Sequence, residues 1–329
     1  MSMPVPKPVI LVPGRLHDHA VRRIAEEFDL VRLDKADPAL VTAELAGWVT
    51  GIAAMTTISA QFIDALPGLR IIANFGVGYD SVDAKHAATR GVMVTNTPDV
   101  LTEEVADTTI ALLLNTLREF PKAEAWLRDG SWAAKGHYPF SRLTLRGRKV
   151  GILGMGRIGL AVARRLDAFG VPVSYHNRRE VEGLPYAWHP TLLDLARAVD
   201  TLISVAPGGP STDRIVGREV LEALGPDGVF VNIGRGSTVD EDALAKALHD
   251  GTIAAAGLDV FDVEPRVRPP ILAAPNTSLL PHVGSASVAT RTAMADLVVD
   301  NLVSWFGTGR ALTPVPETAH IAAAGRGHG

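Results

Sequence analysis

The side chains that could do chemistry together are an arginine, a glutamate and a histidine in the second half of the chain. Arg235, Glu264 and His282 each come shortly after an apolar run typical of a buried strand. In an open sheet of parallel strands, ligands bind outside the carboxyl ends of the strands, so three such ends can converge on one crevice. We therefore interpret the three residues as one candidate site.

These residue types suit proton transfer beside an anionic ligand. Imidazole exchanges a proton near neutral pH, and a neighbouring carboxylate favours its charged form and orients the ring. A guanidinium binds a carboxylate through two parallel, charge-assisted hydrogen bonds. Each residue also has a simpler interpretation, with His282 as a capping residue, Glu264 as the end of a strand and Arg235 as part of a surface turn.

A glycine-rich segment is the clearest local motif. The sequence GILGMGRIG places Gly154, Gly156 and Gly159 between a predicted strand and a predicted helix. The first glycine permits a tight turn, the second lets a pyrophosphate approach the backbone, and the third allows the helix to pack closely. The motif predicts a dinucleotide at the positive end of the helix. Its alternative is a turn that merely needs glycine.

The residues after the next predicted strand indicate which dinucleotide binds. Sites for NAD usually place an Asp or Glu there, which accepts a hydrogen bond from the ribose 2′-hydroxyl. This chain has His176, Asn177, Arg178 and Arg179 instead. Two guanidinium groups can bind a 2′-phosphate, which a carboxylate would repel. We therefore expect NADP(H), with NAD(H) as the second choice. Two solvated surface arginines are the alternative.

Short β-branched runs alternate with helical patterns in two series, which predicts two parallel α/β domains. The expected strands lie at 9–12, 30–33, 51–55, 69–74 and 92–95, and then at 150–153, 171–175, 201–205, 229–233, 255–260 and 278–280. Long helices are predicted over 101–120 and 287–305. The expected fold class is α/β, with two doubly wound parallel sheets, Rossmann-like or flavodoxin-like, and a cleft between them.

The second long helix does not extend the strand pattern before it, so we expect it to return to the first domain. The predicted domains are then a discontinuous substrate-binding domain, a dinucleotide-binding Rossmann domain and a flexible tail. Their expected ranges are 1–99 with 286–318, then 100–285, and then 319–329.

The composition excludes several classes of protein. With 47% hydrophobic and 21% charged residues, both domains can bury a core. A net charge of −4 without a basic tract argues against nucleic acid as a partner. There is no cysteine, and no His/Asp/Glu cluster has metal-ligand spacing, so we expect no metal. No stretch reaches the roughly 18 apolar residues of a membrane span, and we expect a cytoplasmic protein without a signal peptide.

Five motifs in one order carry a family resemblance. They are NFGVGYDSVD, GILGMGRIG, NIGRGSTVDEDAL, GLDVFDVEP and PHVGS, and they span about residues 50 to 315. In this order they resemble the D-isomer-specific 2-hydroxyacid dehydrogenases, and among these the NADPH-preferring glyoxylate/hydroxypyruvate reductases. The resemblance implies reduction of a small 2-keto acid to the 2-hydroxy acid by hydride transfer.

The resemblance also implies residue roles. Arg235, Glu264 and His282 occupy the catalytic positions, and the backbone N–H groups at Val77 and Gly78 would bind the substrate carboxylate. Hydride addition places negative charge on the carbonyl oxygen, so a proton donor must stand beside it. We expect His282 to donate this proton while paired with Glu264. Arg235 would bind the substrate carboxylate and polarise the carbonyl.

The expected cofactor contacts come from the glycine-rich loop and from later strand ends. They are Gly154, Met155, Gly156, Arg157, Ile158, Gly159, Asn177, Arg178, Arg179, Val205, Pro207, Thr212, Ile233, Arg235, Asp259, His282 and Gly284. Other acidic pairs, Glu103/Glu104 and Asp240/Glu241, are expected to favour helix N-termini.

Three other functions fit parts of the sequence. A reductase of bulkier 2-keto acids such as phenylpyruvate, or a phosphoglycerate dehydrogenase, could use the same scaffold. The chain ends soon after the closing helix, which leaves no room for the regulatory domain of many phosphoglycerate dehydrogenases. A nucleotide-sensing protein similar to the transcriptional corepressors of this fold is the alternative from another class.

The segment 120–145 interrupts the alternation of strands and helices. It contains Trp126, Trp132, Tyr138 and Phe140 and is too long for an ordinary connection. Exposed aromatic residues often bury against a partner subunit, and the resembled family uses this region in a two-fold dimer. We expect a homodimer, and the alternative is a loop packed on itself.

Overall fold

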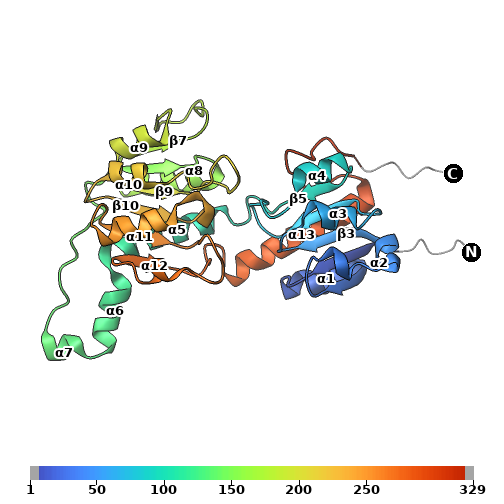
Figure 1. Cartoon of the computed structure of the whole chain (residues 1–329), viewed down its shortest axis with the longest axis horizontal. Helices are drawn as coiled ribbons and strands as arrows, with labels where there is room; N and C mark the ends of the chain where they lie inside the picture. The colour runs from blue at the N-terminus through green and yellow to red at the C-terminus, as the bar shows by residue number, and fades with distance from the viewer. Residues whose placement is uncertain (1–6, 323–329) are drawn as a thin grey trace, which may run out of the picture. The chain divides into compact units, whose positions relative to one another are not determined.

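In a computed structural model, residues 7–322 are described, and the chain divides into two compact units (Figure 1). Unit 1 comprises Met1–Leu101 and Ser287–Gly329, and unit 2 comprises Thr102–Ala286. Each unit contains one parallel sheet with helices on its faces, which confirms the predicted α/β class with two parallel sheets. The assignment of one unit to the substrate and the other to the dinucleotide stays a prediction.

The sheet of unit 1 has five parallel strands in the order β2-β1-β3-β4-β5, which is the flavodoxin-like order. Its strands are β1 (Val9–Pro13), β2 (Asp29–Leu33), β3 (Val49–Ala54), β4 (Ile71–Asn74) and β5 (Met93–Thr95). β4 and β5 are buried throughout, as expected for strands covered on both faces.

Helices cover both faces of this sheet. They are α1 (Asp18–Glu27), α2 (Ala43–Trp48), α3 (Ala60–Asp64), α4 (Ala84–Thr89) and α13 (Val288–Thr308), with a 3₁₀ turn at Pro38–Leu40. Residues of α2, α3 and α4 share one core with Ile52 and Ile72. On the other face α13 approaches β3 closely, since a Cβ on Gly51 would lie 3.4 Å from the Phe306 ring.

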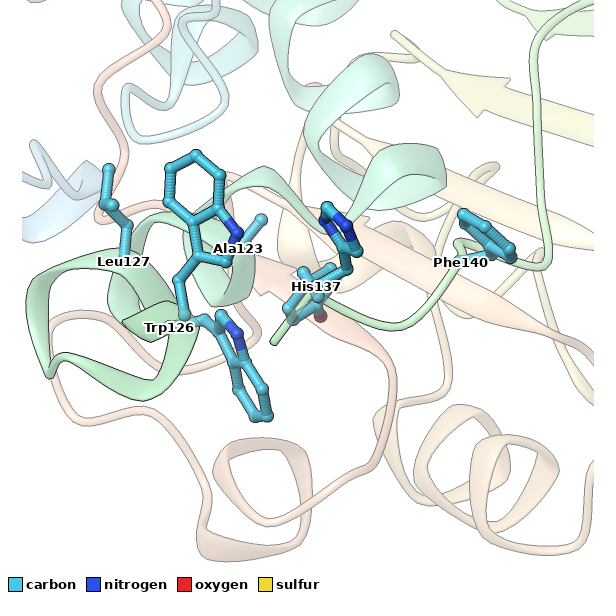
Figure 2. A pocket seen from close by; sticks show the side chains of 7 residues that line it. Ala123, Trp126, Leu127, His137 and Phe140 are labelled. Carbon is cyan, nitrogen blue, oxygen red and sulfur yellow. The ribbon is translucent and has the colours of Figure 1, made fainter. Parts of the chain in front are cut away.

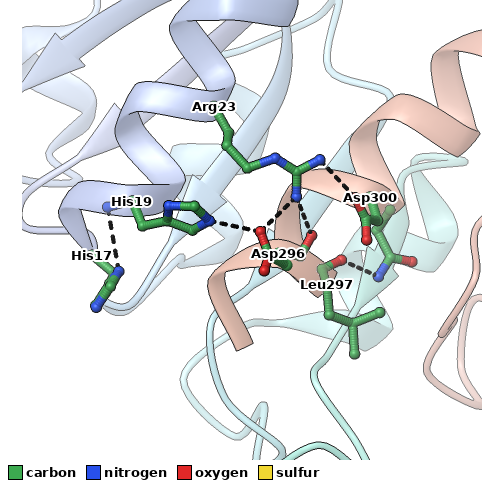
Figure 3. Close-up of polar contacts among 7 residues, drawn as sticks. His17, His19, Arg23, Asp296, Leu297 and Asp300 are labelled. Atoms are coloured by element: carbon green, nitrogen blue, oxygen red, sulfur yellow. Dashed lines mark hydrogen bonds and ion pairs between the residues drawn. The ribbon is translucent and has the colours of Figure 1, made fainter. Parts of the chain in front are cut away.

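A cluster of charged side chains joins α1 to α13 (Figure 3). Arg23 pairs with Asp296 at 2.8 Å and with Asp300 at 2.9 Å, and the His19 ring contacts Asp296 at 2.7 Å. Partial burial raises the pKa of Asp296, but the hydrogen bonds and charges of His19 and Arg23 outweigh it. The pKa of Asp296 is therefore below its usual value. The cluster therefore ties the helix that follows unit 2 to the first helix of the chain.

The sheet of unit 2 has seven parallel strands in the order β12-β11-β10-β9-β6-β7-β8. The strands are β6 (Val150–Leu153), β7 (Val173–His176), β8 (Ala187–Trp188), β9 (Thr201–Ser204), β10 (Val229–Asn232), β11 (Ala255–Leu258) and β12 (Thr277–Leu279). The order reverses between β6 and β9, which is the switch point where doubly wound sheets bind ligands.

Alternate strand residues of unit 2 face opposite sides, and each side has its own core. Phe230 packs in one core with α9 (Leu192–Ala198), α10 (Arg218–Leu224), α11 (Glu241–His249) and α12 (Pro269–Leu272). Val229 and Val231 pack in the other core with α5 (Thr102–Arg118) and α8 (Arg157–Ala168). A short 3₁₀ turn, Gly236–Thr238, precedes α11.

Three features differ from the sequence predictions. The helix expected over 101–120 ends at Arg118, because Glu119 adopts a left-handed φ of 53°. The chain then continues as α6 (Phe120–Arg128) and α7 (Ser131–Lys135), which extend away from the sheet of unit 2 (Figure 1). The sheet of unit 2 also contains a strand that was not predicted, β8, which has only two residues.

The tail expected at 319–329 lies mostly outside the described residues. Within the described part, the Ile321 N–H donates to the Thr318 carbonyl at 2.9 Å, so this stretch ends in a turn. Among residues 7–322, no helix combines the length and apolar character needed to cross a membrane.

Candidate active site

The glycine-rich loop connects β6 to α8. Gly154 has a φ of 101°, in the left-handed region that favours glycine. A Cβ on Gly159 would lie only 2.3 Å from the Gly154 carbonyl oxygen, so α8 packs at a distance that only glycine permits. A Cβ on Gly156, the N-cap of α8, would meet no atom within 4 Å. This combination of a tight loop and an open helix N-terminus fits a pyrophosphate.

Asn177, at the end of β7, braces this loop. Its Oδ1 accepts a hydrogen bond from the Met155 N–H at 2.7 Å, and its Nδ2 donates to the Met155 carbonyl at 3.3 Å. The sequence interpretation gave Asn177 only a contact with the cofactor. Its amide also satisfies both backbone groups of Met155, so it holds the shape of the glycine-rich loop. The contact of Asn177 with the cofactor stays a prediction.

Arg178 and Arg179 follow Asn177 and are exposed. Within residues 7–322, neither guanidinium forms an ion pair with a carboxylate. No acidic residue stands at the end of β7 itself, where His176 and Asn177 lie. The two cations are therefore available to a phosphate next to the ribose.

The ends of β6, β9 and β10 converge around the same loop. A Cβ on Gly154 would lie 3.1 Å from the Ala206 nitrogen, and one on Gly234 would lie 2.5 Å from the Ala206 carbonyl oxygen. After β9, the Thr212 hydroxyl donates to the Pro207 carbonyl at 2.7 Å. The predicted contacts Val205, Pro207 and Ile233 thus lie on these converging strand ends.

Two residues of the glycine-rich loop pack on the core of unit 2, and their contact with a cofactor stays a prediction. Met155 is buried in the core under α8, and Ile158 packs against the same core. Arg157, the first residue of α8, is exposed.

Asp259 follows β11 and fixes the loop that carries the histidine. Its carboxylate accepts hydrogen bonds from the Val283 N–H at 2.7 Å and the Gly284 N–H at 2.8 Å. Its carbonyl accepts a third from the His282 N–H at 2.8 Å. Burial raises the pKa of Asp259, although the two N–H bonds to the carboxylate oppose this shift. The contact of Asp259 with a cofactor stays a prediction.

His282 and Glu264 form an ion pair. The Nδ1 of His282 lies 2.7 Å from Glu264 Oε2, and Glu264 Oε1 accepts a second hydrogen bond from the Phe261 N–H at 3.0 Å. Partial burial raises the pKa of Glu264, but the His282 bond, the Phe261 N–H and the charge of Arg235 outweigh it. The pKa of Glu264 is therefore lowered. Because Nδ1 faces Glu264, the ring's Nε2 is the atom available to a ligand.

Arg235 follows β10, in the turn that precedes α11. Its carbonyl accepts hydrogen bonds from Asn232 Nδ2 at 2.9 Å and from the Thr238 hydroxyl at 2.7 Å. Its guanidinium donates to the Gly234 carbonyl at 2.9 Å, and its charge acts on Glu264. The structure thus brings all three residues of the candidate site to one edge of the sheet of unit 2.

The predicted substrate loop lies in unit 1, after β4. Two asparagine amides hold its carbonyl groups: Asn74 Nδ2 donates to Gly78 O at 3.0 Å, and Asn96 Nδ2 donates to Val77 O at 2.7 Å. Among the described residues, the N–H groups of Val77 and Gly78 have no partner. The loop therefore offers two donors, as an anion site requires. The sequence interpretation missed both asparagines.

A comparison with known families decides where this chain belongs. The family profile for "D-isomer specific 2-hydroxyacid dehydrogenase, NAD binding domain" matches residues 110–284, more than half of the chain. The chain belongs to the D-isomer-specific 2-hydroxyacid dehydrogenases. The matched span contains the glycine-rich loop and the three residues of the candidate site, whereas Val77 and Gly78 precede it.

Individual relatives extend this match over the rest of the dehydrogenase. The crystal structure of NADPH-dependent glyoxylate/hydroxypyruvate reductase from Sinorhizobium meliloti, in complex with NADP and malonate, is 59% identical with a TM-score of 0.95. It covers 97% of this chain and 99% of that one. Hydroxyphenylpyruvate reductase from Plectranthus scutellarioides is 47% identical, covering 78% of this chain and 81% of that protein. Glyoxylate/hydroxypyruvate reductase A from Arabidopsis thaliana is 46% identical with the same coverage.

Proposed function

We propose that this protein reduces glyoxylate or hydroxypyruvate to the 2-hydroxy acid with NADPH. The observation that carries the proposal is the 2.7 Å pair of His282 and Glu264 beside Arg235, at the end of the sheet that carries the glycine-rich loop. The similarity to a reductase solved with NADP supports the choice of cofactor, and two relatives named for these acids support the choice of substrate.

The residues of the candidate site can divide the chemistry between them. Bound NADPH would supply the hydride. In our proposal His282 donates a proton from Nε2 to the carbonyl oxygen. Glu264 binds Nδ1 and stabilises the imidazolium form of the ring, which must be present before the hydride is transferred. Arg235 binds the substrate carboxylate and polarises the carbonyl.

The substrate carboxylate would have a second set of donors in this proposal. The N–H groups of Val77 and Gly78 would bind it, with their carbonyls held by Asn96 and Asn74. The expected cleft between the domains belongs to the same proposal, because the proposal requires the loop at Val77 and Gly78 and the residues around His282 to bind one substrate molecule.

The residues near the glycine-rich loop fit the proposed cofactor. The open backbone at Gly156 can accept a pyrophosphate, and the exposed Arg178 and Arg179 can bind a 2′-phosphate. Contacts from the other predicted residues, including Asn177, Thr212 and Gly284, remain part of the proposal.

The test follows absorbance at 340 nm with glyoxylate, hydroxypyruvate, pyruvate and phenylpyruvate, each with NADPH and with NADH. We expect fast oxidation of NADPH with the first two acids and almost none in His282→Ala. The double variant Arg178→Ala/Arg179→Ala should lose about 10- to 100-fold in kcat/KM for NADPH and keep its activity with NADH, because charged hydrogen bonds are lost. Tight nucleotide binding without turnover of any acid would contradict the proposal.

A second substrate class has a specific observation in its favour. The hydroxyphenylpyruvate reductase of Plectranthus scutellarioides, at 47% identity, is as similar to this chain as the Arabidopsis thaliana reductase at 46%, although less similar than the Sinorhizobium meliloti reductase at 59%. A preference for phenylpyruvate in the same assay would keep the proposed mechanism and replace the substrate.

We also propose that the protein is a homodimer through α6 and α7, which we call the arm. The arm and the segment after it line an open pocket of about 390 Å³ (Figure 2). Trp126, Trp132, Tyr138 and Phe140 line this pocket, and Phe140 is fully exposed. Apolar surface of this kind marks protein interfaces. The cytoplasmic location stays a prediction.

A further inference from the structure

A buried carboxyl group lies under the loop that carries Glu264. Glu241 is the first residue of α11 and is only 4% exposed. Its Oε1 accepts a hydrogen bond from the Asp262 N–H at 2.8 Å, and its Oε2 has no partner among the described residues. Glutamates are seldom buried without a charged partner, so this position requires a reason beyond packing.

Capping of α11 does not supply that reason. The sequence predicts that both Asp240 and Glu241 favour the helix N-terminus, and both lie there. In the structure Asp240 alone is the N-cap, and its Oδ1 accepts hydrogen bonds from the Asp242 and Ala243 N–H groups, both at 3.1 Å. Glu241 instead points away from its own helix to the backbone of Asp262.

The bond from Asp262 sits next to the catalytic pair. Glu264 Oε1 accepts from the Phe261 N–H at 3.0 Å, so two carboxyl groups bind consecutive N–H groups of one turn. The turn that carries Arg235 packs directly on the backbone of Phe261, because a Cβ on Gly236 would lie 1.8 Å from the carbonyl carbon of Phe261. Glu241 thus joins the segment after Arg235 to the segment before Glu264.

We infer that Glu241 is a positioning residue: its single hydrogen bond to the Asp262 backbone holds the 261–264 turn so that Glu264 meets His282. The inference rests on the proposed function, since it assigns Glu241 to the same reaction. Among the described residues, Glu241 has no hydrogen bond or ion pair with His282 or Arg235, so its role is exerted through the turn.

The surroundings of Glu241 favour its neutral form. Burial raises its pKa, and the bond from the Asp262 N–H opposes this shift. The carboxylates of Asp262 and Asp242 raise it further, while Arg268, which binds Asp242 at 2.7 Å, lowers it. A neutral carboxyl keeps an oxygen to accept the N–H, and so does the amide of glutamine.

Because glutamine has the same oxygen acceptor as a neutral glutamate, two substitutions at Glu241 can separate the acceptor from the volume of the side chain. Glu241→Gln retains the acceptor, whereas Glu241→Met fills the same space without one. Asp242→Asn, on the exposed side of α11, is the control for charge changes near this helix. Glu241→Ala, which leaves a gap rather than a new side chain, replaces Glu241→Met if that variant does not fold.

The readout is the pH–rate profile for reduction of glyoxylate with NADPH. In the proposed mechanism His282 supplies a proton, so the rate should fall at alkaline pH. Its ring pairs with Glu264, on which the charge of Arg235 acts, and its own charge acts on Asp259. We expect Glu241→Met to reduce kcat about 10-fold and to move the alkaline fall to lower pH by roughly one unit, because the carboxylate partner of the imidazolium is displaced. Glu241→Gln and Asp242→Asn should stay within about twofold of wild type.

A folded Glu241→Met variant with an unchanged alkaline fall would overturn the inference, whatever its kcat. A second measurement separates this result from failure of the proposed function. The titration of the His282 ring in the full chain, followed by NMR and assigned with His282→Ala, needs no turnover. If wild type reduces no keto acid, the proposed function fails, but a shifted titration in Glu241→Met still supports the positioning role and an unshifted one rejects it.

Discussion

At the scale of single residues, the site depends on carboxyl groups in contrasting states. Glu264 has a lowered pKa because His282, the Phe261 N–H and Arg235 outweigh its partial burial. Asp259 and Glu241 have raised pKa values because burial dominates. Only Glu264 faces the imidazole with its side chain at 2.7 Å. The other two carboxyl groups bind backbone N–H groups and shape the loops.

The lowered pKa of Glu264 fixes the sign of a pH prediction. A depressed carboxyl pKa means that the pair with His282 persists above the usual value of 4.5 and is lost as pH falls through the lower folded value. Wild-type reduction should therefore be level through mildly acidic pH and fall only on the alkaline side. In Glu264→Gln the alkaline fall should move to lower pH by roughly one unit, since a neutral amide does not favour imidazolium.

Initial rates of NADPH oxidation across pH 5 to 9 test this prediction (roughly the range in which imidazole titrates). His282→Ala provides the baseline without a proton donor. An alkaline fall at the same pH in Glu264→Gln and in wild type would show that the carboxylate does not act on the histidine.

At the scale of elements, the loop after β4 depends on asparagines from two strand ends. Asn96→Asp replaces a donor by a carboxylate oxygen 2.7 Å from the Val77 carbonyl, which repels it. We expect KM for the keto acid to rise about 10-fold with a smaller change in kcat, because in our proposal the loop binds substrate and does not transfer the proton. The Kd for NADPH should be unchanged, and a loss of NADPH affinity would argue against a local effect.

The packing of α8 on the glycine-rich loop gives a second prediction for an element. Gly159→Ala places a Cβ 2.3 Å from the Gly154 carbonyl, a backbone atom that cannot move without the loop. We expect the free energy of unfolding to fall by about 1–3 kcal/mol and the affinity for NADPH to fall at least about 10-fold. The control is Gly307→Ala in α13, where a Cβ would meet no atom within 4 Å.

Urea unfolding and nucleotide fluorescence measure the two effects. Gly307→Ala should be neutral or slightly stabilising, because alanine favours a helix more than glycine does. Equal stability of Gly159→Ala and wild type would mean that the loop yields more easily than its geometry implies.

The elements also mark how far the sequence could predict the structure. Periodicity and glycine spacing predicted the strands around Gly154 closely, because those patterns are local. The sequence pattern did not predict the break at Glu119, where one residue takes a left-handed conformation inside an apolar helical pattern. β8 has too few residues for any alternation to appear.

The same division holds in the candidate site. The types and order of Arg235, Glu264 and His282 were readable because their chemistry is distinctive. The roles of Asn96 and Glu241 were not, since each depends on a bond to the backbone of a residue about 20 positions away. No local pattern encodes such a pairing; only the folded topology brings the partners together.

At the scale of the whole molecule, the arm is the proposed interface between two copies of the chain. Leu127 lies in the pocket of the arm and is 56% exposed. If two copies associate there, Leu127→Asp should bury a charge at the interface and give a mass of one chain in light scattering, where wild type gives two. Arg128→Glu, which changes charge on the same helix outside the pocket lining, is the control. A single-chain mass for wild type at micromolar concentration would reject the dimer.

In the sequence, the two segments of unit 1 precede and follow unit 2, and this order matters during synthesis. The ribosome releases 102–286 before 287–322, so unit 2 can complete its sheet while α13 is still missing. The carbonyl of Asn96 then lacks the Thr313 hydroxyl, which in the finished protein donates to it at 2.6 Å and itself accepts from Asn301 on α13. If the proposed roles of the two units hold, a nascent chain completes its nucleotide-binding unit before the loop that binds the keto acid is fully held.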